Sequence, residues 1–128
     1  MLDHIGLPVS DFERSKVFYT AVLAPLGISM LLEKDLSDEG GPAGYCGFGV
    51  DRPTFWIGTG KPFTGRLHVA FAATSRAQVS EFYKAALAAG AKDNGPPGLR
   101  PHYHANYFGA FVIDPDGHNV EAVSHLPE

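Results

Sequence analysis

Two histidines and one glutamate are the residues of this chain whose types and spacing could carry chemistry. His4 and His68 lie 64 residues apart in a chain of 128, and each opens a short apolar segment. Glu121 lies in "HNVEAV", where the period-two alternation of a strand places it on one face with Val123. An unpaired charge among apolar residues is costly, so this carboxylate needs a partner. Two imidazoles and one carboxylate are a ligand set that binds a divalent metal and leaves open positions.

Structural roles for the same three residues remain open. A histidine has many uses in proteins, and both could merely begin strands. Glu121 could form a salt bridge with Arg66 or Arg100. The equivalent placement of the two histidines favours the metal site over these alternatives.

The two histidines belong to an internal repeat. Residues 4–19, "HIGLPVSDFERSKVFY", align with residues 68–83, "HVAFAATSRAQVSEFY", and in both copies an apolar β-like segment precedes a helical pattern. Short β-like runs follow each helix. The pattern predicts an α+β fold with two βαβββ modules, which form a mixed-sheet cleft within a single domain over 1–128. Module 1 covers about 1–60 and module 2 about 65–126.

Capping signals predict where the two helices begin and end. Ser10 with Glu13, and Ser75 with Gln78, have the form of a capping box. Gly90 is expected to cap the end of the second helix. His118 follows the "DPDG" turn signal at 114–117 and is expected to face solvent.

The repeat also predicts where a fourth ligand would lie. The position 64 residues before Glu121 is Ile57, and residues 51–65 contain no His, Glu or Gln. That place is therefore empty, and a three-ligand site stays open to substrate.

A Pro/Gly-rich segment, "NGPPGLRPHYHA" at 94–105, is expected to be a loop, where function often concentrates. Arg100, His102, His104 and the nearby Tyr107 could contact a substrate or shuttle protons. A polar loop that covers a pocket explains them equally well. Trp56 is a candidate for an aromatic wall, although core packing is the commoner use of such a side chain.

Composition restricts the class of protein. The chain is 45% hydrophobic, 19% charged and has a net charge of -4, which is ordinary for a globular domain and offers no basic patch for nucleic acid or membranes. The N-terminal segment lacks the features of a signal peptide, and Cys46 is the only cysteine, so we expect a cytoplasmic protein without disulfides. No base adjoins Cys46 in sequence, which leaves a nucleophilic role unsupported.

The segments "DHIGLPVSDFERSKVFY", "LHVAF" and "DPDGHNVEAV" resemble the vicinal oxygen chelate superfamily (glyoxalases, bleomycin-resistance proteins and ring-cleaving dioxygenases). The resemblance spans nearly the whole chain. It implies a divalent metal held at His4, His68 and Glu121, with Glu121 also catalytic. It further implies a homodimer with sites shared between chains, with His4 from one chain and His68 and Glu121 from the other.

Departures from the family pattern narrow the reaction. Glyoxalase I places a Glu, Gln or His near Ile57, and the ring-cleaving dioxygenases carry a tyrosine where this chain has Phe111. Fosfomycin-modifying enzymes share the His, His, Glu pattern, but Leu7 and Pro8 stand where a strand threonine is expected. We therefore expect a metal-dependent enzyme acting on a small oxygen-bearing substrate, of the glyoxalase-like lyase/isomerase or a related transferase type. The metal could be Fe, Mn, Ni or Zn. The alternative is a protein of bleomycin-resistance type that sequesters a small ligand without chemistry.

Overall fold

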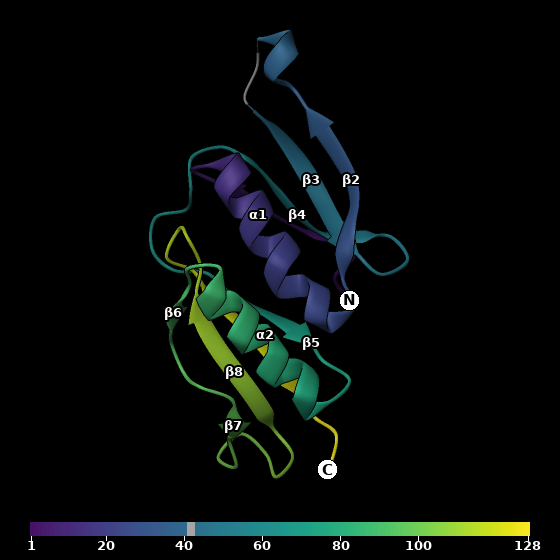
Figure 1. The fold of residues 1–128 in the computed structure, drawn as a ribbon, viewed down its shortest axis with the longest axis vertical. Helices are drawn as coiled ribbons and strands as arrows, with labels where there is room; N and C mark the ends of the chain where they lie inside the picture. The colour runs from purple at the N-terminus through teal and green to yellow at the C-terminus, as the bar shows by residue number, and fades with distance from the viewer. Residues whose placement is uncertain (41–42) are drawn as a thin grey trace.

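The computed structural model describes residues 1–40 and 43–128, and its first module has the order strand, helix and three strands (Figure 1). Its elements are β1 (Ile5–Val9), α1 (Phe12–Leu23), β2 (Ser29–Asp35), β3 (Gly44–Gly49) and β4 (Pro53–Thr59), with short 3₁₀ turns at Ala24–Leu26 and Ser37–Glu39. The sheet order is β1-β4-β3-β2. β1 runs parallel to β4, and the other pairs are antiparallel.

The second module repeats this plan. Its elements are β5 (His68–Ala72), α2 (Arg76–Ala88), β6 (Lys92–Asp93), β7 (Gly98–Leu99), β8 (Phe108–Ile113) and β9 (Asn119–Ser124). The sheet order is β5-β9-β8-β6, and β7 also pairs with β8. β5 runs parallel to β9, as β1 does to β4. The prediction of an α+β fold with two βαβββ modules is confirmed.

The register of the parallel pairs corrects one prediction. Gly6 pairs with Trp56 in the first sheet, and Ala70 pairs with Glu121 in the second. The counterpart of Glu121 is therefore Trp56 and not Ile57. The second module carries one residue more between its parallel strands, so the offset of 64 that aligns the first strands and helices becomes 65. Ile57 is buried, 1% exposed, on the side of the sheet that faces the helices.

The helix ends agree with the sequence signals in one module and differ in the other. Ser75 caps α2 by accepting a hydrogen bond from the backbone N–H of Gln78 at 3.1 Å. The cap of α1 is Asp11, which accepts from the N–H of Arg14 at 3.1 Å, so the prediction of Ser10 was wrong. Ala89 is the C-cap of α2, and Gly90 follows it with a φ of 96°, the left-handed conformation that glycine adopts without strain.

One core lies between the two sheets and the two helices. α1 packs on β3 and β4, α2 packs on β8 and β9, and the two helices also contact each other, as Figure 1 shows. Phe18, Val22, Phe48, Phe82 and Val112 are all at most 1% exposed within this core. Burying an aromatic or aliphatic side chain of this kind stabilises the fold by about 1.5–3 kcal/mol.

The turn after β8 joins the modules. The buried hydroxyl of Tyr19 in α1 donates to the Asp114 carboxylate at 2.5 Å. Ser10 donates to Asp116 through both its N–H, at 3.2 Å, and its hydroxyl, and Arg14 lies 3.4 Å from the same carboxylate. Ser10 is thus engaged by the other module, which explains why it does not cap α1.

His118, at the end of this turn, is 0% exposed, so the expectation that it faces solvent was wrong. The ring Nδ1 of His118 accepts from the backbone N–H of Leu67 at 3.0 Å, and the backbone N–H of His118 donates to the Asp114 carboxylate at 2.8 Å. Residues that follow turns are often exposed, but here the bond from Leu67 holds the imidazole inside, and the bond from the backbone N–H of His118 to Asp114 holds its main chain.

Each sheet has a second face that α1 and α2 do not cover. The alternation along β1 and β4 places Gly6, Pro8 and Trp56 on this face in module 1, and the register of β5 and β9 places His68 and Glu121 on it in module 2. The β2–β3 hairpin reaches beyond the end of α1 (Figure 1). No helix in the described part of the chain is long and apolar enough to cross a membrane.

Candidate functional site

His68 and Glu121 meet on the uncovered face of the second sheet. His68 Nε2 lies 2.8 Å from Glu121 Oε1. The Glu121 side chain is 1% exposed, whereas that of His68 is 52% exposed. A deeply buried carboxylate is thus joined to an imidazole that solvent or a ligand can reach.

Tyr107 is hydrogen-bonded to the other oxygen of the Glu121 carboxylate. Its hydroxyl donates to Glu121 Oε2. Burial, together with the hydrogen bond to the Glu121 carboxylate, holds the pKa of Tyr107 well above its ordinary value. The phenol therefore keeps its proton near neutral pH and acts as a donor.

Arg66 and Arg100, the arginines considered from sequence as salt-bridge partners of Glu121, are hydrogen-bonded to backbone carbonyls instead. Arg66 Nε donates to the Gly117 carbonyl at 3.1 Å. Arg100 donates to the Gly98 carbonyl at 2.9 Å and to the Pro96 carbonyl at 2.7 Å. Among the described residues, the bonded partners of Glu121 are the imidazole of His68 and the phenol of Tyr107, and no Lys or Arg side chain bonds to it.

Gly109 makes room for the contact between Tyr107 and Glu121. A Cβ at this position would lie 3.1 Å from Tyr107 Cε1 and 3.2 Å from Glu121 Oε2. Both distances are tighter than most Cβ contacts, so a side chain here would push the phenol ring or the carboxylate by a few tenths of an ångström. Glycine in a strand often marks such a close approach.

A pocket gathers these groups with part of the predicted loop. It is lined by His68, Tyr103, His104, Tyr107, Phe111 and Glu121. The structure therefore brings His104 and Tyr107 to the His68–Glu121 pair, as the sequence suggested. Arg100 and His102 line a neighbouring pocket that shares Tyr103 and Phe111.

A second histidine pair lies at the edge of this pocket. His104 Nε2 is 2.6 Å from His125 Nδ1, and the two rings stack with centroids 4.8 Å apart. His104 Nδ1 accepts the backbone N–H of Asn106 at 3.1 Å. This bond places the proton of neutral His104 on Nε2, from which it is donated to His125.

His4 has a different partner. Its Nδ1 lies 2.7 Å from Asp3 Oδ1, and Arg52 lies 3.3 Å from the same oxygen. The hydrogen bond from His4 and the charge of Arg52 lower the pKa of Asp3. A histidine that donates from Nδ1 to a carboxylate has Nε2 free as a ligand atom.

His4 and His68 line one pocket where β1 and β5 adjoin, and Glu121 lines the other. Within the described residues, no three His, Cys, Asp or Glu side chains lie close enough together to hold a metal ion. Within one chain, His68 is thus bonded to Glu121, whereas His4 is bonded to Asp3.

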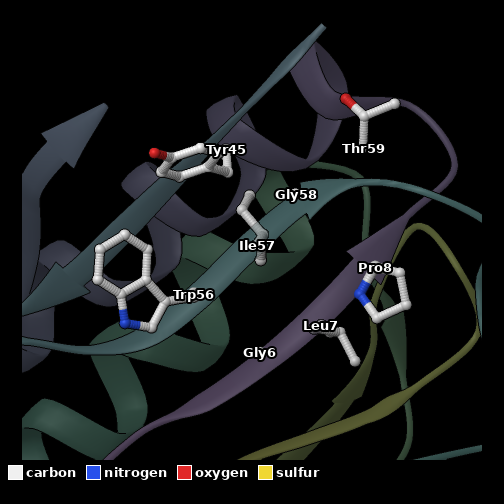
Figure 2. Close-up of a pocket in the computed structure, with 8 residues that line it drawn as sticks. All are labelled: Gly6, Leu7, Pro8, Tyr45, Trp56, Ile57, Gly58 and Thr59. Atoms are coloured by element: carbon white, nitrogen blue, oxygen red, sulfur yellow. The ribbon is translucent and has the colours of Figure 1, made fainter. Parts of the chain in front are cut away.

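Trp56 lines a separate pocket on the first module (Figure 2). Its ring lies beside that of Tyr45, with centroids 6.1 Å apart. A Cβ at Gly47 would lie 2.9 Å from two Trp56 ring atoms, so the indole lies directly over bare backbone. Gly6 and Gly58 also line this pocket, and a Cβ at Gly6 would meet no atom within 4 Å.

Cys46 belongs to the core. It is 0% exposed, and burial raises the pKa of its thiol to about 11. A thiol with so little thiolate is a poor nucleophile at neutral pH.

Sequence reasoning missed three residues of these sites: Gly109, Tyr45 and Asp3. Tyr45 alternates with core residues along β3, a pattern that the sequence carries. Asp3 directly precedes His4, and this adjacency was also visible. The packing of Gly109 against Glu121 depends on strand register, which local sequence does not show.

The fold agrees with that of known proteins. Residues 1–122 match the family model described as the Glyoxalase/Bleomycin resistance protein/Dioxygenase superfamily. The match covers nearly the whole chain, so the protein belongs to this superfamily. A search of curated proteins gives no match.

Solved structures with the same fold include a glyoxalase/bleomycin resistance protein from Albidiferax ferrireducens T118. It is 30% identical, with 99% of each chain covered and a TM-score of 0.79. A mutant of glyoxalase I from Zea mays is 25% identical over 95% of this chain and 46% of that chain, with a TM-score of 0.69. A mutant of the fosfomycin resistance protein FosX from Listeria monocytogenes, complexed with Mn(II), is 19% identical, covers 96% and 88%, and also has a TM-score of 0.69.

Proposed function

We propose that this protein is a metal-dependent enzyme that acts on a small oxygen-bearing substrate, with chemistry of the glyoxalase-like lyase/isomerase type or of a related transferase. The observation that carries the proposal is the 2.8 Å contact between His68 Nε2 and the buried Glu121 Oε1. These are the two atoms through which the residues would bind a metal. Membership of the superfamily, which includes glyoxalases, supports the same activity.

The donor set fits a divalent cation. Glu121 supplies a carboxylate and His68 an imidazole, and metals such as Fe, Mn, Ni and Zn bind both. The carboxylate is buried, and no Lys or Arg of the part of the chain that the structure describes bonds to it, so a cation would compensate its charge. When bound, the metal supplies a Lewis acid that polarises oxygens of the substrate.

The chain's own residues would then have distinct tasks. Glu121 lines the pocket and is the residue that would take a proton from the substrate. His104 and Tyr107 would orient the substrate, since both line the pocket with Glu121. Arg100 and His102 would contact the substrate from the neighbouring pocket that they line. Trp56 would stack on a flat part of the substrate.

We further propose that two copies of the chain share each site. The uncovered face of the first sheet exposes apolar and aromatic side chains, among them Leu32 and Tyr45, which are 44% and 41% exposed. Pairing module 1 of one copy with module 2 of the other covers both faces and can bring His4 to the partner's pair. Isologous dimers are the commonest oligomers.

The test is metal content measured by elemental analysis after reconstitution and desalting. The wild type should retain a divalent metal, and His68→Ala and Glu121→Gln should lose it while circular dichroism stays unchanged. His125→Ala is the matched control, because it removes an imidazole from the other histidine pair. Metal that persists in His68→Ala and disappears in His125→Ala would place the ion at His104 and His125 and refute the proposal.

A second candidate function has its own observation in its favour. Tyr45 and Trp56 flank a glycine-lined surface that needs no metal to bind a planar molecule. A sequestering protein would bind its ligand equally well with and without a chelator. Turnover, or binding that requires metal, supports the enzyme.

A further inference from the structure

Both oxygens of the Glu121 carboxylate are already engaged. Oε1 contacts His68 Nε2 at 2.8 Å, and Oε2 accepts the hydroxyl of Tyr107. Oε1 shares the pocket with an imidazole that is half exposed, whereas Oε2 is held by a phenol. A cation that replaces the contact between His68 and Glu121 would therefore meet one oxygen and not two.

The phenol of Tyr107 is held on several sides. The backbone N–H of Tyr107 donates to the His104 carbonyl at 3.2 Å, and the Tyr107 carbonyl accepts from the backbone N–H of Arg100 at 2.7 Å. Its ring lies edge-on to those of Tyr103 and His125, with centroids 4.8 and 5.3 Å away. These contacts set the direction from which the hydroxyl reaches Glu121.

Gly109 completes the arrangement. It pairs with Val123 in β8 and β9, one step along the same face from the pair of Phe111 with Glu121. Because a Cβ here would lie within 3.2 Å of both Tyr107 and Glu121, the absence of a side chain lets the phenol and the carboxylate meet.

We propose that Tyr107 is a positioning residue that holds Glu121 as a single-oxygen ligand, with Oε1 directed at the metal and Oε2 reserved for the phenol. This inference rests on the proposed function. A hydrogen bond to the outer oxygen fixes the rotation of the carboxylate, so less ordering remains to be done when the cation binds. Loss of such outer partners typically costs about 10–100-fold in metal affinity.

The experiment is titration of metal-free protein with Mn²⁺ and, separately, Zn²⁺ by isothermal calorimetry. Tyr107→Phe removes only the hydroxyl and is expected to weaken binding about 10–100-fold. Tyr103→Phe is the matched control, since its ring packs on Tyr107, and it should bind as the wild type does. Gly109→Ala should weaken binding in the same sense as Tyr107→Phe.

A spectroscopic measurement separates positioning from loss of structure. Infrared difference spectra of metal-loaded minus metal-free protein report the splitting of the carboxylate bands, which is wide for one-oxygen and narrow for two-oxygen coordination. The splitting should narrow in Tyr107→Phe and stay wide in Tyr103→Phe. Wild-type affinity and wild-type splitting in Tyr107→Phe would overturn the inference alone. A wild-type protein that binds neither metal would overturn the proposed function and this inference with it.

Discussion

Trp56 and Glu121 occupy equivalent places in the two modules, since Trp56 pairs with Gly6 of β1 as Glu121 pairs with Ala70 of β5. The repeated position thus carries an indole in one sheet and a carboxylate in the other. If two copies pair module to module, the indole of one chain faces the carboxylate of its partner. One wall of each cleft would stack on a ligand, and the other would hold charge.

Trp56 is the only tryptophan of the chain, so its fluorescence reports on this face alone. We predict that acrylamide quenches it more strongly as the protein is diluted from micromolar to nanomolar concentration, because dissociation uncovers the sheet. Light scattering over the same range checks the oligomeric state. Constant quenching with a constant monomer mass would contradict the shared site.

Mixing two defective variants tests the sharing directly. His4→Ala and Glu121→Gln should each bind little metal, and their heterodimer should recover one of its two sites. The recovery is half the wild-type content, because the other site carries both changes. Native mass spectrometry confirms that heterodimers form. Confirmed heterodimers without metal would mean that the ligands lie within one chain.

Two glycines on the uncovered face of module 1 form a matched pair for mutation. Gly47→Ala places a methyl group 2.9 Å from the Trp56 ring and 2.7 Å from Pro53 Cβ, so we expect a loss of about 1–3 kcal/mol. Gly6→Ala meets no atom within 4 Å and should change stability little. Urea unfolding of both variants measures the difference. Equal stability of the two variants would contradict the packing of Trp56 on Gly47.

The bond between Tyr19 and Asp114 predicts a decline in stability at high pH. Burial, with Asp114 nearby, raises the pKa of Tyr19 well above its ordinary 10.0. The stabilisation is complete below pH 10 and is lost above it, because the unfolded chain ionises there and the folded chain does not. The slope approaches about 1.4 kcal/mol per pH unit.

Urea unfolding of the wild type and Tyr19→Phe between pH 8 and 11 isolates this effect. Tyr83 and Tyr107, whose pKa values are also raised, are present in both proteins and cancel. The wild type should lose its advantage over Tyr19→Phe as the pH rises. A difference that stays constant across this range would show that Tyr19 ionises alike in the folded and unfolded chains.

Cys46 should be inert in the folded protein. Its thiol is buried and has a pKa of about 11, so a disulfide reagent such as DTNB should react at pH 8 only as fast as the fold opens. Addition of denaturant should release one thiol per chain. Rapid titration of the native protein would contradict this placement.

The sequence predicted those features that depend on local pattern. The repeat predicted equivalent places for His4 and His68, and the structure puts His4 directly before β1 and His68 at the start of β5. Ser75 was correctly predicted as a cap. The wrong predictions have long-range causes. Ser10 bonds to Asp116, which lies 106 residues away in sequence, and His118 is anchored by Leu67, 51 residues before it. Ile57 was wrongly predicted as the counterpart of Glu121, because the second module has one residue more between its parallel strands. The periodicity within a strand does not reveal this extra residue.

The "DPDG" turn has a consequence for how the chain comes apart. It lies in module 2, yet its two carboxylates are bonded to Tyr19, Ser10 and Arg14 of module 1, beside a core that both modules share. If module 1 unfolded first, the buried Asp114 carboxylate would lose its donor, and if module 2 unfolded first, the buried Tyr19 hydroxyl would lose its acceptor. The repeat therefore behaves as one cooperative unit, and heating or denaturant should dismantle both halves in a single transition.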